Sequence, residues 1–146
     1  ECHKKNIKVE IIYSGSVFDA LGETGLQLYK FGKIASMPKW QDSFKPNSFL
    51  DFVEENIKID AHSLILIDIG LDFEKAIEQL VKASEIKSIA LDKIIVCNLL
   101  GTKKSKIFYG SINKIKKQKV KAPFCFIIPG KMHFFEKEVL GMFEVG

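Results

Sequence analysis

Short runs of hydrophobic residues alternate along this chain with stretches in which hydrophobic residues recur every three or four positions. Short apolar runs bounded by turn residues are typical of buried strands, and the three-and-four spacing is typical of the buried face of a helix. The alternation of the two patterns predicts an α/β protein, in which a mixed sheet has helices on both of its faces.

Strands are predicted wherever a short run is rich in β-branched, aromatic or other apolar residues. The predicted strands are residues 7–13, 26–30, 64–69, 94–100, 106–109 and 124–128. The run at 64–69, bounded by His62 and Gly70, has the near-continuous hydrophobic pattern of a strand that is covered on both faces.

Helices are predicted at residues 17–21, 49–57, 72–81 and about 132–142. Ser48 and Asp51 resemble an N-terminal capping box for the second of these helices, and Asp72 is placed to cap the third. The third has one continuous apolar stripe, formed by Phe73, Ala76, Ile77, Leu80 and Val81.

The positive charge of the chain is concentrated in one segment. The chain contains 22 Lys and no Arg, and its formal net charge is +4. Eight of the lysines and no acidic residue lie between Gly101 and Ala122, so the rest of the chain carries 14 Lys against 18 acidic residues. Because arginine supplies the planar fork that reads guanine and phosphate, sequence-specific recognition of nucleic acid is not predicted.

Common catalytic motifs are absent from the sequence. It has no Gly-rich phosphate loop, G-x-S-x-G elbow, H-E-x-x-H sequence or paired-cysteine motif, so no NTPase, hydrolase or zinc site is predicted. His62 and His133 lack the spacing of metal ligands, and a structural or surface role is predicted for each. Asp68 is interpreted as a cap or turn residue, with substrate binding at the end of a strand as the less frequent alternative.

The sequence also bears on cellular location. No hydrophobic stretch approaches the roughly 20 residues that span a bilayer, so no membrane association is expected. Cys2, Cys97 and Cys125 are odd in number and form no C-x-x-C motif, which favours free thiols in a reducing, cytoplasmic location. The first residues lack both an initiator Met and the apolar centre of a signal peptide, so the chain is expected to be a piece of a longer protein that is not secreted.

Four sequence blocks together resemble one known family. The blocks are residues 22–33 (GETGLQLYKFGK), 51–56 (DFVEEN), 62–69 (HSLILIDI) and 129–133 (PGKMH). They resemble, in this order, the diphthine synthases, a family in the tetrapyrrole-methylase class of S-adenosylmethionine-dependent methyltransferases. The first block is specific, and the resemblance extends over nearly the whole chain.

The resemblance implies a two-domain enzyme of which this chain is a part. Residues 1–16 resemble the last helix–strand unit of the N-terminal domain of the family, and residues 17–146 resemble its C-terminal methyltransferase domain. Roughly the first 40% of the usual family length would then precede Glu1.

The resemblance also implies a site for the methyl donor, S-adenosylmethionine, in the cleft between the two domains. The matching positions are Ser16, Val17, Ile67, Leu100 and Phe124. They are expected to lie close together where parallel strands end, on one side of the sheet, and to supply a hydroxyl, main-chain groups and apolar walls. Without the family, Ser16 would be interpreted as a helix cap and the three apolar residues as core.

The matched segments depart from the family pattern at several positions. Phe124 stands in the place of a histidine, so no polar side-chain contact is expected there. The family has an arginine in the segment that corresponds to residues 98–102, where this chain has none, which weakens any substrate contact carried over to Leu99.

The reaction implied by the family is methyl transfer to the modified histidine of translation elongation factor 2 during diphthamide synthesis, by a cytoplasmic enzyme that forms a homodimer. The donor is already activated, so the protein is expected to align the reacting groups and exclude water. No catalytic side chain and no metal are therefore assigned.

The lysine-rich segment from Lys103 to Lys121 has three interpretations. It is a lysine-protected edge of the sheet, a surface that steers the elongation factor, or a nonspecific RNA-binding surface whose affinity falls steeply with salt. An alternative for the whole chain is a non-catalytic dimerisation or RNA-binding module.

Overall fold

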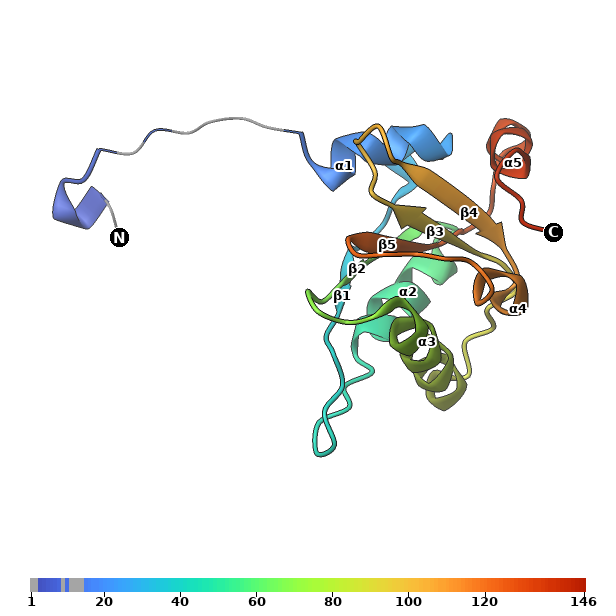
Figure 1. The fold of residues 1–146 in the computed structure, drawn as a ribbon, viewed down its shortest axis with the longest axis horizontal. Helices are drawn as coiled ribbons and strands as arrows, with labels where there is room; N and C mark the ends of the chain where they lie inside the picture. The colour runs from blue at the N-terminus through green and yellow to red at the C-terminus, as the bar shows by residue number, and fades with distance from the viewer. Residues whose placement is uncertain (1–2, 9, 11–14) are drawn as a thin grey trace.

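The computed structural model describes residues 3–8, 10 and 15–146 of the chain. Within this part, five strands form one mixed sheet in the order β1-β2-β5-β3-β4 (Figure 1). The strands are β1 (Ala35–Met37), β2 (Ser63–Ile67), β3 (Ile94–Asn98), β4 (Lys106–Gly110) and β5 (Phe124–Ile128). β1 is parallel to β2, β5 is antiparallel to both β2 and β3, and β3 is antiparallel to β4.

Helices cover both faces of this sheet, so the expected α/β class is confirmed (Figure 1). On one face lie α2 (Phe49–Lys58) and α3 (Phe73–Lys87), and on the other lie α1 (Val17–Ala20), the 3-10 helix η2 (Leu21–Thr24) and α5 (Phe134–Gly141). The remaining short helices are η1 (His3–Lys5), η3 (Leu28–Lys30) and α4 (Ile112–Ile115). None of the described helices is long and apolar enough to cross a bilayer.

The sheet separates two hydrophobic cores. Successive side chains of a strand point to opposite faces, so Ile65 and Phe126 pack with α2 and α3 while Leu64 and Ile127 pack on the α5 side. Because both faces are covered, the central strands need hydrophobic residues at consecutive positions. This is why the predicted strands at 64–69, 94–100 and 124–128, together with 106–109, are confirmed within one or two residues at their ends.

The predicted helices are confirmed in position, but two of their predicted N-terminal capping bonds do not form. The predicted helices correspond to α1, α2, α3 and α5, and the stripe on α3 is buried at Phe73, Ala76, Ile77 and Leu80. Ser48 makes no capping bond because its own backbone is already helical, with φ −61° and ψ −20°. Asp72 is the N-cap of α3 but likewise makes no side-chain capping bond.

The strand predicted at 26–30 is wrong. This segment contains η3, and only Leu26 is buried whereas Leu28 and Tyr29 are exposed. Thr24 bends the chain just before it, since the Thr24 hydroxyl donates to Leu21 O and accepts from Leu26 N–H. The parallel edge strand is instead β1, whose three residues are too short a run to be distinguished in the sequence.

The strand predicted at 7–13 falls largely on residues outside the described part of the chain. Ile7, Lys8 and Glu10, which are described, belong to no strand.

Candidate functional site

A cavity of about 850 Å³ opens at one edge of the sheet. β2 and β3 are both antiparallel to β5, so the carboxyl ends of β2 and β3 meet at the edge where β5 begins. Four segments line the cavity: residues 15–23, the end of β2, the β3–β4 connection and the start of β5. Its volume lies within the range of about 300–1,000 Å³ that is usual for small-molecule sites.

All five residues matched to donor-contacting positions line this cavity. They are Ser16, Val17, Ile67, Leu100 and Phe124. They come from segments up to 108 residues apart in the sequence, and the sheet topology brings them together.

The expected arrangement of their side chains needs two corrections. Ile67 and Phe124 pack in the core beneath α3, whereas Val17 and Leu100 pack on the opposite, α5 side. The expectation of a single wall on one side of the sheet is therefore wrong, because the cavity wraps around the sheet edge and contacts both faces. In addition, Phe124 opens the antiparallel strand β5 and does not end a parallel strand.

Ser16 is the N-cap of α1. Its hydroxyl oxygen accepts the Phe18 N–H at 3.3 Å, and its own N–H donates to the Asp19 carboxylate at 3.1 Å, which together form a capping box. The interpretation as a helix cap is thus confirmed. The hydroxyl proton of Ser16 takes no part in this box, so it can still be donated to a ligand in the cavity.

Hydrogen bonds at the end of β3 fix the two connections that form the opposite wall, the β3–β4 connection and the connection that leads into β5. Asn98, which is buried, donates from Nδ2 to Lys121 O at 2.5 Å and to Pro123 O at 3.1 Å. Leu99 N–H also donates to Pro123 O at 3.1 Å. The chain then turns sharply, with Leu99 at φ 55° and Gly101 at φ 73°. A polar residue ending an apolar strand was the only sequence signal for this anchor.

Glu23 connects the wall formed by residues 15–23 to the β3–β4 connection. Its carboxylate accepts the Gly101 N–H at 2.9 Å and the hydroxyl of Ser105. Sequence reasoning did not single out Glu23, although it lies within the block that resembles the family. Together with Asp19, Glu23 gives this wall a negative charge.

Two cysteines lie beside the cavity on neighbouring strands. Cys97 and Cys125 are directly opposite each other in β3 and β5, and both are free and buried. A hydrogen bond with Cys125 and burial raise the pKa of Cys97 well above its usual value. The Cys97 thiol therefore remains neutral and adds an apolar surface to the cavity.

The other residues singled out in the sequence have structural roles. His133 is exposed and caps α5, with its ring Nδ1 accepting the Phe135 N–H at 3.5 Å. Asp68 accepts the Lys39 N–H at 3.1 Å in a turn outside the cavity. No group of three or more His, Cys, Asp or Glu in the described residues is arranged to hold a metal ion.

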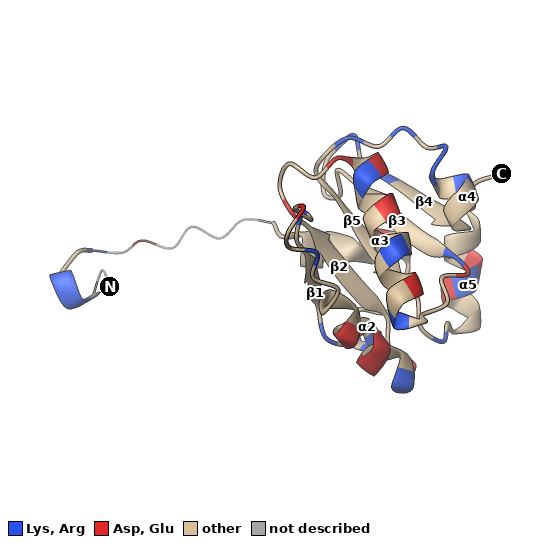
Figure 2. Ribbon diagram, turned by 90° about the horizontal axis from the view of Figure 1, so that it is seen from below, with Lys and Arg blue, Asp and Glu red and all other residues tan. Residues whose placement is uncertain are grey.

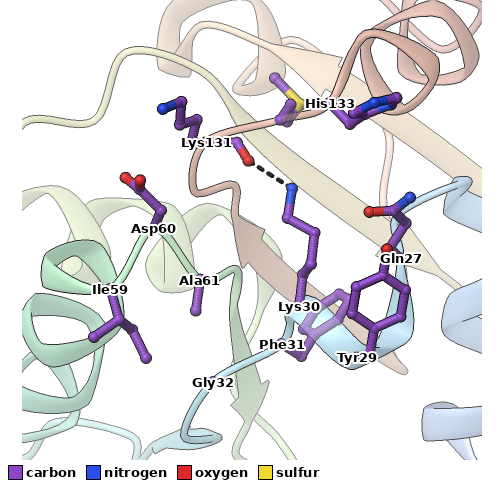
Figure 3. Close-up of a pocket in the computed structure, with 11 residues that line it drawn as sticks. Gln27, Tyr29, Lys30, Phe31, Gly32, Ile59, Asp60, Ala61, Lys131 and His133 are labelled. Atoms are coloured by element: carbon purple, nitrogen blue, oxygen red, sulfur yellow. Dashed lines mark hydrogen bonds between the residues drawn. The ribbon is translucent and has the colours of Figure 1, made fainter.

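A second cavity, of about 600 Å³, lies where the segment 27–32 meets residues 59–61 and 131–133 (Figure 3). Lys30 Nζ donates to Lys131 O at 2.6 Å and to Glu136 Oε2 at 2.7 Å, so its ammonium group is already committed within the protein. None of the five matched residues lines this cavity. The sheet-edge cavity is therefore the candidate ligand site.

The class of fold follows first: the mixed five-stranded sheet with helices on both faces has the tetrapyrrole-methylase-type architecture of its structural neighbours. A crystal structure from Entamoeba histolytica assigned as a diphthine synthase superposes with a TM-score of 0.91 and 26% sequence identity, covering 99% of this chain and 63% of that one. No family model matches the chain.

Similarity to curated proteins identifies the family more narrowly. The diphthine synthase of Methanococcus maripaludis is 36% identical over 154 residues, which cover 96% of this chain and 59% of that protein. The diphthine methyl ester synthase of Kluyveromyces lactis is 44% identical over 79 residues, covering 54% of this chain and 26% of that protein. This chain is therefore a relative of the diphthine synthases, and it spans about three fifths of the length of its archaeal relative.

Proposed function

We propose that this chain forms one wall of the methyl-donor cleft of an S-adenosylmethionine-dependent methyltransferase. The observation that carries the proposal is the convergence of Ser16, Val17, Ile67, Leu100 and Phe124 on one cavity. The similarity to diphthine synthases makes the modified histidine of translation elongation factor 2 the proposed methyl acceptor, in diphthamide synthesis.

The residues around the cavity suit S-adenosylmethionine. The walls are mainly apolar, as an adenine ring and a methylene chain require, and the free hydroxyl proton of Ser16 is available to an acceptor atom. Asp19 and Glu23 provide negative charge on one wall, which favours a ligand that carries sulfonium and ammonium groups.

The bound donor supplies an already activated methyl group. The residues of this chain therefore bind and orient, and no nucleophile of their own is required. The fixed connections at Asn98 and Glu23 hold the walls in place before the acceptor arrives, which reduces the entropic cost of alignment. The apolar side chains of Val17, Ile67 and Leu100 exclude water from the reacting groups.

The proposal includes a domain division. Residues 1–16 are assigned to the end of a preceding domain and residues 17–146 to the C-terminal methyltransferase domain. The support is that all the strands and both cores of the described part lie within 17–146, and that the chain spans only 59% of its archaeal relative. The preceding domain would close the other side of the cavity.

The remaining parts of the proposal are a homodimer and a cytoplasmic location. Exposed apolar side chains around the second cavity support self-association. The free thiols of Cys97 and Cys125, which face each other across two strands, support a reducing compartment.

Donor binding tests the proposed function directly. The part of the Methanococcus maripaludis relative that this chain does not match would be fused to the whole chain, which keeps Ser16 in the cavity, and S-adenosylhomocysteine would be titrated calorimetrically into the fusion and into the chain alone. We expect one site in the fusion and at least about tenfold weaker binding to the chain alone, a difference of about 1.4 kcal/mol.

Matched variants locate the site. Leu100→Trp fills the cavity and should weaken binding at least about tenfold, whereas Ile86→Trp, on the exposed face of α3, should leave it unchanged. A folded fusion that binds no S-adenosylhomocysteine, under conditions where the relative does, would contradict the proposal.

A further inference from the structure

Eight exposed lysines and no acidic residue lie between Gly101 and Ala122, and we call these lysines the lysine surface. They are Lys103, Lys104, Lys106, Lys114, Lys116, Lys117, Lys119 and Lys121, and all eight are exposed. None of them forms an ion pair with a described residue, although six lysines elsewhere in the described chain do. Figure 2 shows the contrast with α3, where basic and acidic residues alternate.

Protection of a sheet edge does not account for this surface. β4 is the edge strand, but Lys106 is the only one of the eight lysines that it carries. The outer side of β4 is also covered at Tyr109, where the Tyr109 N–H donates to Phe143 O at 2.9 Å and Val145 N–H donates to Tyr109 O at 2.9 Å. The other seven lysines lie in α4 and in the connections on either side of it and of β4.

The two connections that carry most of these lysines converge on the sheet-edge cavity. The β3–β4 connection carries Lys103 and Lys104 and begins with residues 99–102, which line the cavity. The α4–β5 connection carries Lys116, Lys117, Lys119 and Lys121 and runs into Pro123, which also lines the cavity. The bonds from Asn98 Nδ2 to Lys121 O and from Leu99 N–H to Pro123 O join the two connections at this point.

The composition of the surface distinguishes between polyanionic partners. Nucleic-acid recognition uses arginine and exposed aromatic rings that stack on bases, but the chain has no Arg, Tyr109 is buried and Phe108 packs partly against the core. Flexible lysines without a stacking surface suit carboxylates spread over a protein, where charge complementarity sets orientation and association rate.

We propose that the lysine surface docks an acidic face of the protein substrate and thereby presents the substrate to the mouth of the sheet-edge cavity. This inference rests on the proposed function, because it takes the methyl acceptor to be a protein. Asp19 lies on the wall formed by residues 15–23, so an acidic partner is attracted to the lysine side of the mouth and repelled from the side of Asp19.

The test measures binding of the purified chain to elongation factor 2 in the form that carries the unmethylated modified histidine. Lys104, Lys119 and Lys121 would be changed together to Gln. The matched control changes Lys45, Lys82 and Lys137 to Gln, which removes the same charge from exposed lysines outside the surface. At about 50 mM salt we expect about tenfold weaker binding for the first variant and less than about twofold for the control.

Two further measurements separate the possible failures. S-adenosylhomocysteine titrated into the fusion protein should give the same affinity with and without the three lysine changes, since these side chains do not line the cavity. If the fusion without lysine changes did not bind S-adenosylhomocysteine, the proposed function would be contradicted. The comparison of the two triple lysine variants would still decide whether the lysine surface docks the elongation factor.

The second measurement is retention of polyuridylic acid. The docking proposal is wrong if the chain does not bind the elongation factor, if both triple variants weaken binding equally, or if polyuridylic acid binds more tightly than the elongation factor through the same lysines. The last result would assign the surface to RNA.

Discussion

At the scale of single residues, the most tightly bonded group in the described chain is the buried carboxylate of Glu136. Its Oε1 accepts the Gln27 N–H and the ring of His62, each at 3.0 Å, and its Oε2 accepts the His133 N–H at 2.6 Å and Lys30 Nζ at 2.7 Å. Burial would raise the pKa of Glu136, but these hydrogen bonds outweigh it and lower the pKa to about 2.

The bonding of His62 fixes its tautomer. Nδ1 accepts the Gly130 N–H at 3.0 Å, so the ring proton lies on Nε2, which donates to Glu136. Burial lowers the pKa of His62 despite the neighbouring Glu136, which keeps the ring neutral near pH 7. The charged Lys30 thus compensates the negative charge of Glu136, and the neutral His62 adds a hydrogen bond, so the charge of this buried carboxylate is paired.

Changing Glu136→Gln should destabilise the fold in a pH-dependent way. The usual pKa of 4.5 falls to about 2 on folding, which corresponds to about 3 kcal/mol of stability at neutral pH. Because the pKa is depressed in the folded state, this contribution is complete above pH 4.5 and is lost as the pH falls towards 2. Urea denaturation should therefore show a difference of about 3 kcal/mol near pH 7 that disappears near pH 2.

The control is Glu138→Gln, which removes an exposed carboxylate from the same helix and should change the unfolding free energy by less than about 0.5 kcal/mol. A loss in Glu136→Gln that is equally large at both pH values would show that the charge of Glu136 is not what stabilises the network.

Sequence reasoning identified some residues at this scale but not their partners. A structural role for His62 and His133 is confirmed, yet Glu136 lies 74 residues from His62 and no local pattern connects them. The five cavity residues came from the family resemblance, since hydrophobicity alone would have placed Ile67, Leu100 and Phe124 in the core. The core interpretation and the cavity interpretation are each partly correct, because these side chains pack in the cores and also line the cavity.

At the scale of elements, the close approach of the segment after β5 to the turn after α2 depends on a glycine. A Cβ added to Gly130 would lie 2.5 Å from Ala61 O and 2.6 Å from Asp60 O, both of which are backbone atoms that cannot move aside as a side chain would. Gly130 also donates its N–H to His62, so this contact connects the two central strands β2 and β5 with the Glu136 network.

Gly130→Ala should therefore lower the unfolding free energy by about 1–3 kcal/mol, the usual cost of forcing extra volume into a packed site. Gly141→Ala is the matched control, because its added Cβ meets open space at the end of α5 and should be neutral or stabilising by up to about 1 kcal/mol. Thermal or urea denaturation of both variants measures the effect. Equal stability of the two would mean that the backbone at residues 60–61 relaxes freely.

Which elements could be predicted follows from how deeply each is buried. β2, β3 and β5 carry a long apolar run because both of their faces are covered, and α3 has a full apolar stripe. β1 and η3 were missed because contacts with distant parts of the chain determine their backbone conformation, and the local pattern of hydrophobic residues does not. For example, Phe31 and His62 form an isolated parallel bridge, with Gly32 N–H donating to His62 O at 3.0 Å.

At the scale of the whole molecule, the sequence predicted a mixed α/β sheet but not its strand order. The antiparallel β5 inserts between the parallel-running β2 and β3, although it is the last strand in the chain. This order is set by long-range packing, and it decides that the cavity lies at the carboxyl ends of two strands and the amino end of a third. Only the family resemblance brought the residues of these three strands together in advance.

The proposed homodimer makes a prediction at this scale. Tyr29 and Ile59 are 82% and 71% exposed and line the second cavity (Figure 3). Phe134 is 72% exposed, and its ring packs against that of His133, which also lines this cavity. Large apolar side chains grouped in this way around a concave surface are typical of protein interfaces. We therefore expect light scattering to give a mass of twice 16.5 kDa for the unmodified chain.

The double change Tyr29→Ser and Phe134→Ser should shift this mass to 16.5 kDa, because it removes two exposed aromatic anchors without disturbing the buried cores. Ile86→Ser is the control, since Ile86 is 65% exposed but isolated on α3, where its removal should leave the dimer intact. The two ends of the sheet would then have separate tasks, with ligand binding at the carboxyl ends of β2 and β3 and self-association around the second cavity. A dimer that survives the double change would place the interface elsewhere, and a monomeric unmodified chain would contradict the homodimer.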